Sequence, residues 1–115
     1  MRRVKSHTVG IDRGSQVLFS DFEHDGEMWT GQGPRKLVTA VRFSEAFVTP
    51  PVIHVSVSMW DLDKRTNARA DIAAQNTTPT GFEIVFRTWG DTRVARLRVD
   101  WMAIGEVRSD DDWDV

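Results

Sequence analysis

The sequence contains no cysteine, and its longest apolar runs are short. Without cysteine the chain has no disulfide, no zinc–thiolate or iron–sulfur site and no thiol nucleophile. The short apolar runs argue against a membrane-spanning helix, so we expect no membrane insertion. The basic residues in the segment 1–7 are not followed by the apolar stretch of an ordinary secretory signal. We therefore expect the protein to be synthesised in the cytoplasm and then either released from the cell or displayed on a particle surface.

A strong excess of one charge is also missing. The 15 basic and 17 acidic residues give a net charge of -2. Nucleic-acid-binding domains usually carry a basic excess, so we expect no nucleic-acid partner. The basic residues that are present are mostly arginine, whose planar guanidinium suits hydroxyl pairs and carboxylates and stacks on aromatic rings.

Apolar and polar residues alternate along most of the chain, which is the period of a β-strand. The alternation is carried by six segments, at 15–22, 37–43, 53–59, 68–75, 82–87 and 95–103. Turn residues separate these segments, most clearly at 49–51 and 78–81. Short strands at regular spacing indicate an all-β fold, a six-stranded antiparallel β-sandwich, and no segment has the pattern of a long helix.

The chain is long enough for one domain and for a core that needs neither metal nor disulfides. Within that single domain, residues 1–36 are expected to supply the N-terminal strand or strands and a glycine-rich loop. Residues 37–107 are expected to form the core of the sandwich. Residues 108–115 form an acidic tail, expected either to fray or to dock through Trp113.

No catalytic or metal-binding pattern is recognisable. The three histidines are far apart in sequence, and none has the spacing of a metal ligand pair (His7, His24 and His54). Asp61 and Asp63 could begin a calcium loop, but the later ligands of that motif are absent. We therefore expect no cofactor and no enzyme. A glycan hydrolase is the least favoured alternative, since two carboxylates distant in sequence can still meet in a fold.

The loops are rich in tryptophan, arginine, aspartate and asparagine, which suits the recognition of sugars. An aromatic ring stacks on the apolar C–H face of a pyranose, and the polar side chains hydrogen-bond its hydroxyl rim. A buried polar group that loses its hydroxyl partner is costly, which gives selectivity. Tryptophan and arginine are also enriched in protein–protein hot spots, so composition alone leaves both kinds of partner open.

Four short motifs then occur in a fixed order: VRFSEAFVTPPVIHV at 41–55; WD at 60–61 with NAR at 67–69; TPTGF at 78–82 with TWGDTRV at 88–94; and VDWMAI at 99–104. Together they cover about residues 37–104, and the segment 4–14 gives a weaker match. In this order and spacing the chain resembles the H-type lectin domain, the family of snail agglutinins and of the C-terminal domains of discoidins.

The resemblance implies a homotrimer of six-stranded β-sandwiches that binds galactose or N-acetylgalactosamine at one end, near subunit contacts. It places the family's arginine at Arg69 and its tryptophan at Trp89. The family's histidine after that tryptophan is replaced here by Gly90, and its first-loop aspartate has no counterpart in the segment 31–33. Gln32, Asp91 or Asp61 are the candidates for the missing polar groups.

Each of these residues also has a plain structural interpretation. Arg69 could form a surface ion pair with Asp71 or Asp100, and Trp89 could be an aromatic at the edge of the core. Trp101 lies in an apolar row and is expected in the core or at a subunit seam. Two further tryptophans each have two interpretations. Trp29 is either a second stacking platform for a sugar or a lid that packs on the sandwich. Trp60 lies either at the edge of the core or in the binding site.

The sequence thus predicts a lectin module for cell-surface glycans, made multivalent by trimerisation. Its carbohydrate-binding residues are expected to be Arg69, Trp89, Gly90, Gln32 and Asp91. The alternative is a structural or adhesion subunit of a phage-like or gene-transfer particle that keeps the fold and has altered or lost sugar binding.

Overall fold

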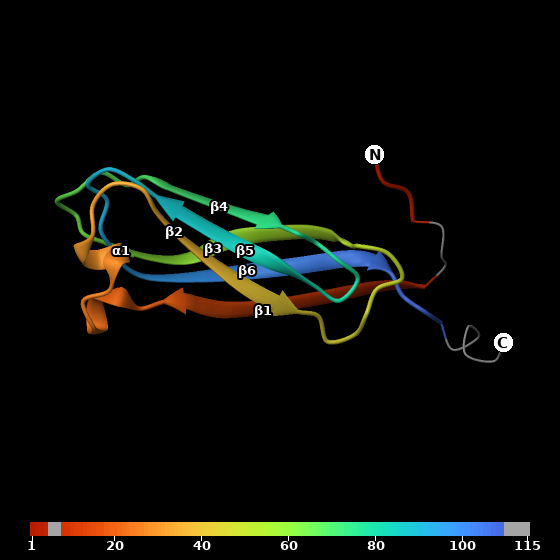
Figure 1. The fold of residues 1–115 in the computed structure, drawn as a ribbon. Coiled ribbons are helices and arrows are strands. Elements are labelled where there is room, and N and C mark those ends of the chain that lie inside the picture. Colours follow the sequence, from red (N-terminus) through yellow and green to blue (C-terminus); the bar gives the residue numbers. More distant parts are fainter. Residues whose placement is uncertain (5–7, 110–115) are drawn as a thin grey trace.

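The computed structural model describes residues 1–4 and 8–109. Its six strands form two three-stranded antiparallel sheets that face each other as a sandwich (Figure 1). One sheet has the order β1-β6-β3, with bounds Val9–Phe19, Val94–Glu106 and Val52–Leu62. The other has the order β2-β5-β4, with bounds Arg35–Arg42, Gly81–Thr88 and Ala70–Gln75. The predicted six-stranded antiparallel sandwich is confirmed.

The first strand begins earlier and ends earlier than the sequence predicted. β1 runs over Val9–Phe19 rather than 15–22, and Asp21–Glu23 form a 3-10 turn, η1. The start was missed because the usual pattern is inverted there: Ile11 faces outward, whereas Gly10 and Gly14 face the core. A Cβ at Gly14 would lie 2.6 Å from Nε1 of the core residue Trp101, so only glycine fits.

The glycine-rich loop expected at 29–35 is shorter than predicted. Trp29 and Thr30 belong to a short helix, α1 (Glu27–Thr30), and Met28 on this helix is buried. The helix is tied to the preceding turn, because the Met28 N–H donates to the Asp21 carboxylate at 3.0 Å. Among the described residues no helix has the length and apolar character needed to cross a membrane.

The core fills the space between the two sheets and is strongly aromatic. Phe43 stacks on Phe82 with ring centroids 5.8 Å apart, and Phe82 meets Trp101 edge-on at 5.4 Å. Trp101 is therefore a core residue of the single chain. Offset and edge-on aromatic pairs add about 0.5–1.5 kcal/mol each beyond the area that they bury.

The outward face of the β1-β6-β3 sheet carries an apolar patch at one end. Register places Ile11, Ile104 and Val52 directly side by side across the three strands. Ile11 is 66% exposed and Val52 is 51% exposed, and Val9 and Met102 adjoin them. We call these five residues the sheet patch.

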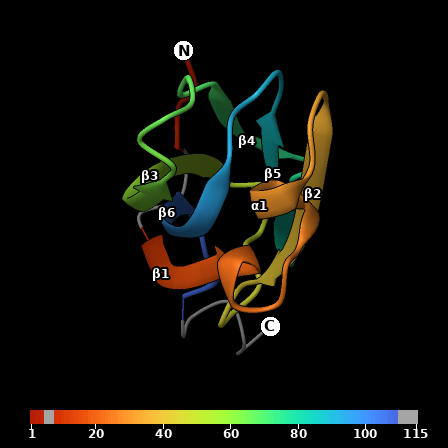
Figure 2. The same ribbon diagram turned by 90° about the vertical axis from the view of Figure 1, so that its left-hand side faces the viewer.

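Three loops meet at the end of the sandwich that bears α1, away from the N-terminus (Figures 1 and 2). They are the segments 31–34, 63–69 and 89–93. Register places the start of β2, the end of β5 and the start of β4 in one row, with Arg35 opposite Thr88 and Thr88 opposite Ala70. The sheet thus brings together residues that are more than fifty positions apart in the sequence.

Candidate functional site

Arg69 and Asp91 form an ion pair at the end of the sandwich. The Arg69 guanidinium donates from Nη1 to Asp91 Oδ1 at 2.9 Å, and Asn67 Nδ2 donates to the same oxygen at 3.3 Å. The Asn67 hydrogen bond, assisted by the charge of Arg69, holds the pKa of Asp91 below its usual range. The two side chains of the ion pair are 40% and 50% exposed, so both can reach a ligand.

The partner of Arg69 is therefore neither of the carboxylates considered from sequence. Asp71 lies 3.8 Å from Arg87 on β5. Asp100 lies on the other sheet, where hydrogen bonds from Ser15 and Ser58 lower its pKa. The pairing with Asp91 arises because the loop after β5 folds back toward the start of β4, and no local sequence spacing encodes that return.

Trp89 is the first residue after β5, and its indole is open to solvent. The strand alternation turns Thr88 inward, at 1% exposure, and Trp89 outward, at 44%. The structure therefore places this tryptophan outside the core. Gly90 follows with φ of +70°, a left-handed conformation that favours glycine. A Cβ at Gly90 would lie 3.3 Å from Arg69 Nη1, so the missing side chain lets the guanidinium rest against the loop.

Two buried threonines fix the backbone around Arg69. Thr92 is fully buried, donates from Oγ1 to the Asn67 carbonyl at 2.5 Å and accepts from the Arg69 N–H at 3.0 Å. Thr88 donates from Oγ1 to the Arg69 carbonyl at 2.6 Å. Sequence reasoning missed both residues. The signal that could have found them is a pair of threonines flanking the exposed tryptophan, in TWGDT.

A buried arginine ties α1 to two of the three loops. Arg35 is 6% exposed and donates hydrogen bonds to five backbone carbonyls of α1 and of the loops at 31–34 and 89–93. The shortest, at 2.7 Å, joins Nη2 to the Thr92 carbonyl. Burial lowers the pKa of Arg35, and the negative charge of Glu27 opposes that effect. Its role was not foreseen, because an arginine after Gly-Pro is typical of a surface loop.

The glycine-rich loop lies beside Gly90. The Gly33 N–H donates to the Gly90 carbonyl at 2.9 Å, which brings Gln32 to the same end of the molecule. Gln32 is exposed, and within the described residues its side chain forms no hydrogen bond. The structure thus gathers Arg69, Gly90 and Asp91 and sets the loop of Gln32 next to them. Their role in binding a sugar stays a prediction.

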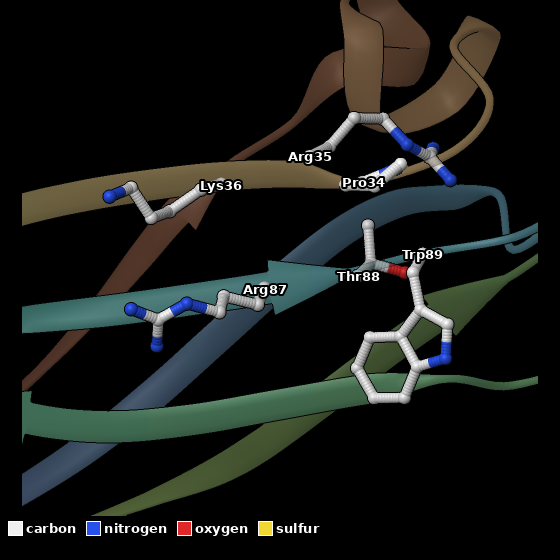
Figure 3. A pocket seen from close by; sticks show the side chains of 6 residues that line it. All are labelled: Pro34, Arg35, Lys36, Arg87, Thr88 and Trp89. Atoms are coloured by element: carbon white, nitrogen blue, oxygen red, sulfur yellow. The ribbon is translucent and has the colours of Figure 1, made fainter.

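A depression of about 310 Å³ adjoins the tryptophan. It runs over the ends of β2 and β5 and is lined by Pro34, Arg35, Lys36, Arg87, Thr88 and Trp89 (Figure 3). Lys36 and Arg87 line it together with the indole, and they come from the neighbouring strands β2 and β5. The site therefore joins an exposed aromatic ring to a polar cluster on the loops and to cations on the sheet.

The aspartates of the D-x-D segment lie elsewhere and are occupied. Asp61 pairs with Arg96 of β6 at 2.9 Å. Asp63 is buried, and hydrogen bonds from Arg65 lower its pKa to about 2. Among the described residues no group of three or more potential ligands is placed to hold a metal ion.

The remaining aromatic and histidine candidates are not part of this cluster. Trp29 has the Arg93 guanidinium over its ring, 4.8 Å from the ring centroid, so that one face of this ring is already occupied. Trp60 is 47% exposed on β3, in the sheet opposite that of β5. His54 is exposed on the same strand. Two predicted features lie outside the described residues (His7 and the docking of Trp113).

Comparison with known proteins identifies relatives of this arrangement. The model of the H-type lectin domain family matches residues 38–104. A protein of Fuscovulum blasticum called ATP synthase subunits region ORF 7 is 56% identical over 108 residues, which is 94% of each chain. Discoidin-2 of Dictyostelium discoideum is 31% identical over 83 residues, which is 70% of this chain and 32% of that protein.

Solved structures show the same fold. Discoidin II of Dictyostelium discoideum superposes with a TM-score of 0.76 at 21% identity, over 94% of this chain and 41% of that one. The tailspike protein gp49 of Pseudomonas phage LKA1 superposes with a TM-score of 0.55 at 15% identity, over 87% of this chain and 15% of that one. At these identities the likeness concerns the fold alone.

Proposed function

The chain belongs to the H-type lectin domain family, and from that premise we propose that it binds cell-surface glycans at the end of the sandwich bearing Trp89 and Arg69. The observation that carries the proposal is that an exposed tryptophan, Trp89, and the exposed Arg69–Asp91 ion pair lie on the same loops at this end, Asp91 being two residues after Trp89. By resemblance, the preferred sugar is galactose or N-acetylgalactosamine. The proposed activity is binding without catalysis.

The chemistry of the cluster fits a sugar ring. The apolar C–H face of a pyranose packs on Trp89, and its hydroxyls meet the Arg69 donors and the Asp91 acceptors at the ring's edge. Gln32, which has no partner within the described residues, supplies a further donor and acceptor from the neighbouring loop. Each hydrogen bond to a charged group contributes about 1.5–3 kcal/mol, so two or three of them give a selective but weak single site.

Multivalency would raise that weak affinity. We propose that three copies assemble through the sheet patch, whose central residues Ile11, Ile104 and Val52 lie in one row and expose apolar surface. A symmetric trimer would point three identical sites in one direction, and simultaneous engagement then multiplies the affinity without new contacts.

A glycan array tests the proposal. Wild-type protein and Arg69→Ala are applied to the same array, and galactose-family glycans should be bound by the wild type and lost in the variant. Arg96→Ala is the matched control, because Arg96 forms an equally short and equally exposed ion pair with Asp61 elsewhere. Equal binding by wild type and Arg69→Ala would contradict the assignment of the site.

The second candidate is a structural or adhesion subunit of a particle that retains the fold. It is favoured by Gly90 and by the segment 31–33, where the family resemblance calls for a histidine and an aspartate. A blank array from folded wild-type protein would support this candidate. Release of reducing sugar from a glycan, lost on replacing one carboxylate, would instead favour a hydrolase.

A further inference from the structure

Two cations stand directly opposite each other on the outward face of the β2-β5-β4 sheet. Register pairs Lys36 on β2 with Arg87 on β5, and Figure 3 shows both side chains lying along the same face. Like charges in directly opposed positions destabilise a sheet. The sequence therefore keeps a locally unfavourable pair at the edge of the candidate site.

The pair is only partly neutralised. Asp71, opposite Arg87 on β4, is the one carboxylate in the row, and its Oδ2 lies 3.8 Å from Arg87 Nη1. Both of these side chains are about half exposed, so the ion pair is weak. Within the described residues Lys36 has no hydrogen bond or ion pair. The row thus has two cations for one carboxylate and retains donors for an anion.

The cations share a depression with Trp89. Both line the same hollow of about 310 Å³. Figure 3 shows both side chains extending along the sheet, with their charged heads directed away from the indole. Long cationic side chains commonly bury their stems and keep their heads in water. A ligand on Trp89 would therefore contact apolar surface at the indole, and a longer ligand that extends along the sheet would reach the charged groups of Lys36 and Arg87.

We infer that the glycan bound at this end is acidic and spans at least two sugar residues. One ring packs on Trp89, and the carboxylate or sulfate of a neighbouring residue is held by Arg87 and Lys36. The guanidinium can bind either group with two parallel hydrogen bonds, and the ammonium adds a point charge. This inference rests on the proposed carbohydrate binding and names the class of glycan.

The net charge of the protein does not supply the attraction. The whole chain has a net charge of -2, so an acidic glycan is not drawn to the molecule as a whole. Recognition must come from local cations such as those of the row, and charges that are exposed to solvent are screened by salt. Raising the salt concentration about tenfold should therefore weaken binding of the acidic glycan by more than binding of its neutral counterpart.

The test compares matched glycans that differ only in charge. Uronic-acid-containing oligosaccharides are printed beside their carboxyl-reduced forms, and sulfated galactose oligosaccharides beside their desulfated forms. Wild-type protein should bind at least one acidic form about tenfold more tightly than its neutral match, the factor that corresponds to one net charge-assisted contact. The two arms show whether carboxylate or sulfate is the group recognised.

Three variants assign the effect to the row. Lys36→Gln and Arg87→Gln should each remove most of the acidic preference, measured as the ratio of binding of the acidic form to binding of its neutral match by the same variant. Arg42→Gln removes the same charge from the same face of β2, about 20 Å further along the strand, and should change nothing. Lys36→Gln should also keep or raise the urea midpoint of unfolding, because it removes the like-charge pair.

The outcomes are distinguishable. Equal or tighter binding of the neutral forms by wild type overturns the acidic-glycan inference and leaves the proposed lectin function intact. An acidic preference that survives both row variants, or falls equally in Arg42→Gln, also overturns it. Failure of folded wild type to bind any form overturns the inference together with the proposed function.

Discussion

Replacing Arg35 by methionine should destabilise the protein far more than an average change at a charged residue. Methionine keeps an apolar stem in the same space but removes every donor. The two acceptors in buried surroundings, the carbonyls of Met28 and Thr92, would then be left without their Arg35 donors. An unsatisfied buried acceptor costs about 1–3 kcal/mol, so two of them cost about 4 kcal/mol.

Part of that cost is returned, because the variant no longer buries a charge. The lowered pKa of Arg35 shows that burial disfavours its charged form. We therefore expect a net loss of about 3 kcal/mol, a large share of the roughly 5–15 kcal/mol that holds an ordinary domain folded. With a urea m-value of about 1.5 kcal/mol/M, the midpoint of unfolding falls by about 2 M.

Urea unfolding followed by tryptophan fluorescence measures this change. Arg42→Met, at the other end of β2, is the control, because Arg42 is exposed, and its free energy of unfolding should change by less than about 0.5 kcal/mol. A loss below about 1 kcal/mol in Arg35→Met, or an equal loss in the control, would refute the view that Arg35 ties α1 to two loops of the site.

Three further predictions follow from the same contacts. Gly90→Ala forces a side chain into φ of +70° beside Arg69, and should cost about 1–2 kcal/mol in urea unfolding and weaken glycan binding. Asp63 has a pKa of about 2 against an ordinary 3.8, so its stabilising contribution is complete above that ordinary value and is lost as the pH falls through about 2. Asp63→Asn should flatten this acidic part of the stability–pH curve in urea titrations, and an unchanged curve would contradict the assignment. Ile104→Arg should convert the trimer to a monomer, because it places a charge in the sheet patch, and light scattering measures the change in mass. A wild-type protein that is itself a monomer would contradict assembly through the sheet patch.

The strands that the sequence predicted well are those whose inward side chains are apolar. On β6, Leu97, Val99 and Ala103 are fully buried while Arg98 and Asp100 face outward, so the alternation was visible. β1 broke the rule, because its inward positions include Gly10 and Gly14, and size rather than hydrophobicity decides what fits there. The alternation of apolar and polar residues reveals strands that bury apolar side chains. It does not reveal a strand whose close packing requires glycine at its inward positions.

The candidate site was predictable where motif order carried it and not where tertiary contacts did. Arg69, Trp89 and Gly90 came from the resemblance, and the structure places them at one end of the sandwich. The pairing of Arg69 with Asp91 needed the return of a loop across 22 positions. The burial of Arg35 needed five carbonyls from separate segments, which no local pattern in the sequence announces.

The cations of the sheet row were invisible for a related reason. Lys36 and Arg87 are far apart in the sequence, and only the β2–β5 register makes them neighbours. Either residue alone is typical of an ordinary solvated charge on a strand. Their significance lies in direct opposition beside an exposed indole, which is a property of strand pairing rather than of composition.

The central claim, that a glycan binds at Trp89 and Arg69, is tested most directly by titrating the best array glycan into isotope-labelled protein. The five tryptophans give separate indole N–H signals in a nuclear magnetic resonance spectrum, and Trp89→Phe identifies the one that belongs to Trp89. The account expects a saturable shift of the Trp89 signal, with the signal of buried Trp101 unmoved. A titration that leaves Trp89 unmoved, or that shifts only the signal of Trp60 on the opposite sheet, would contradict the account.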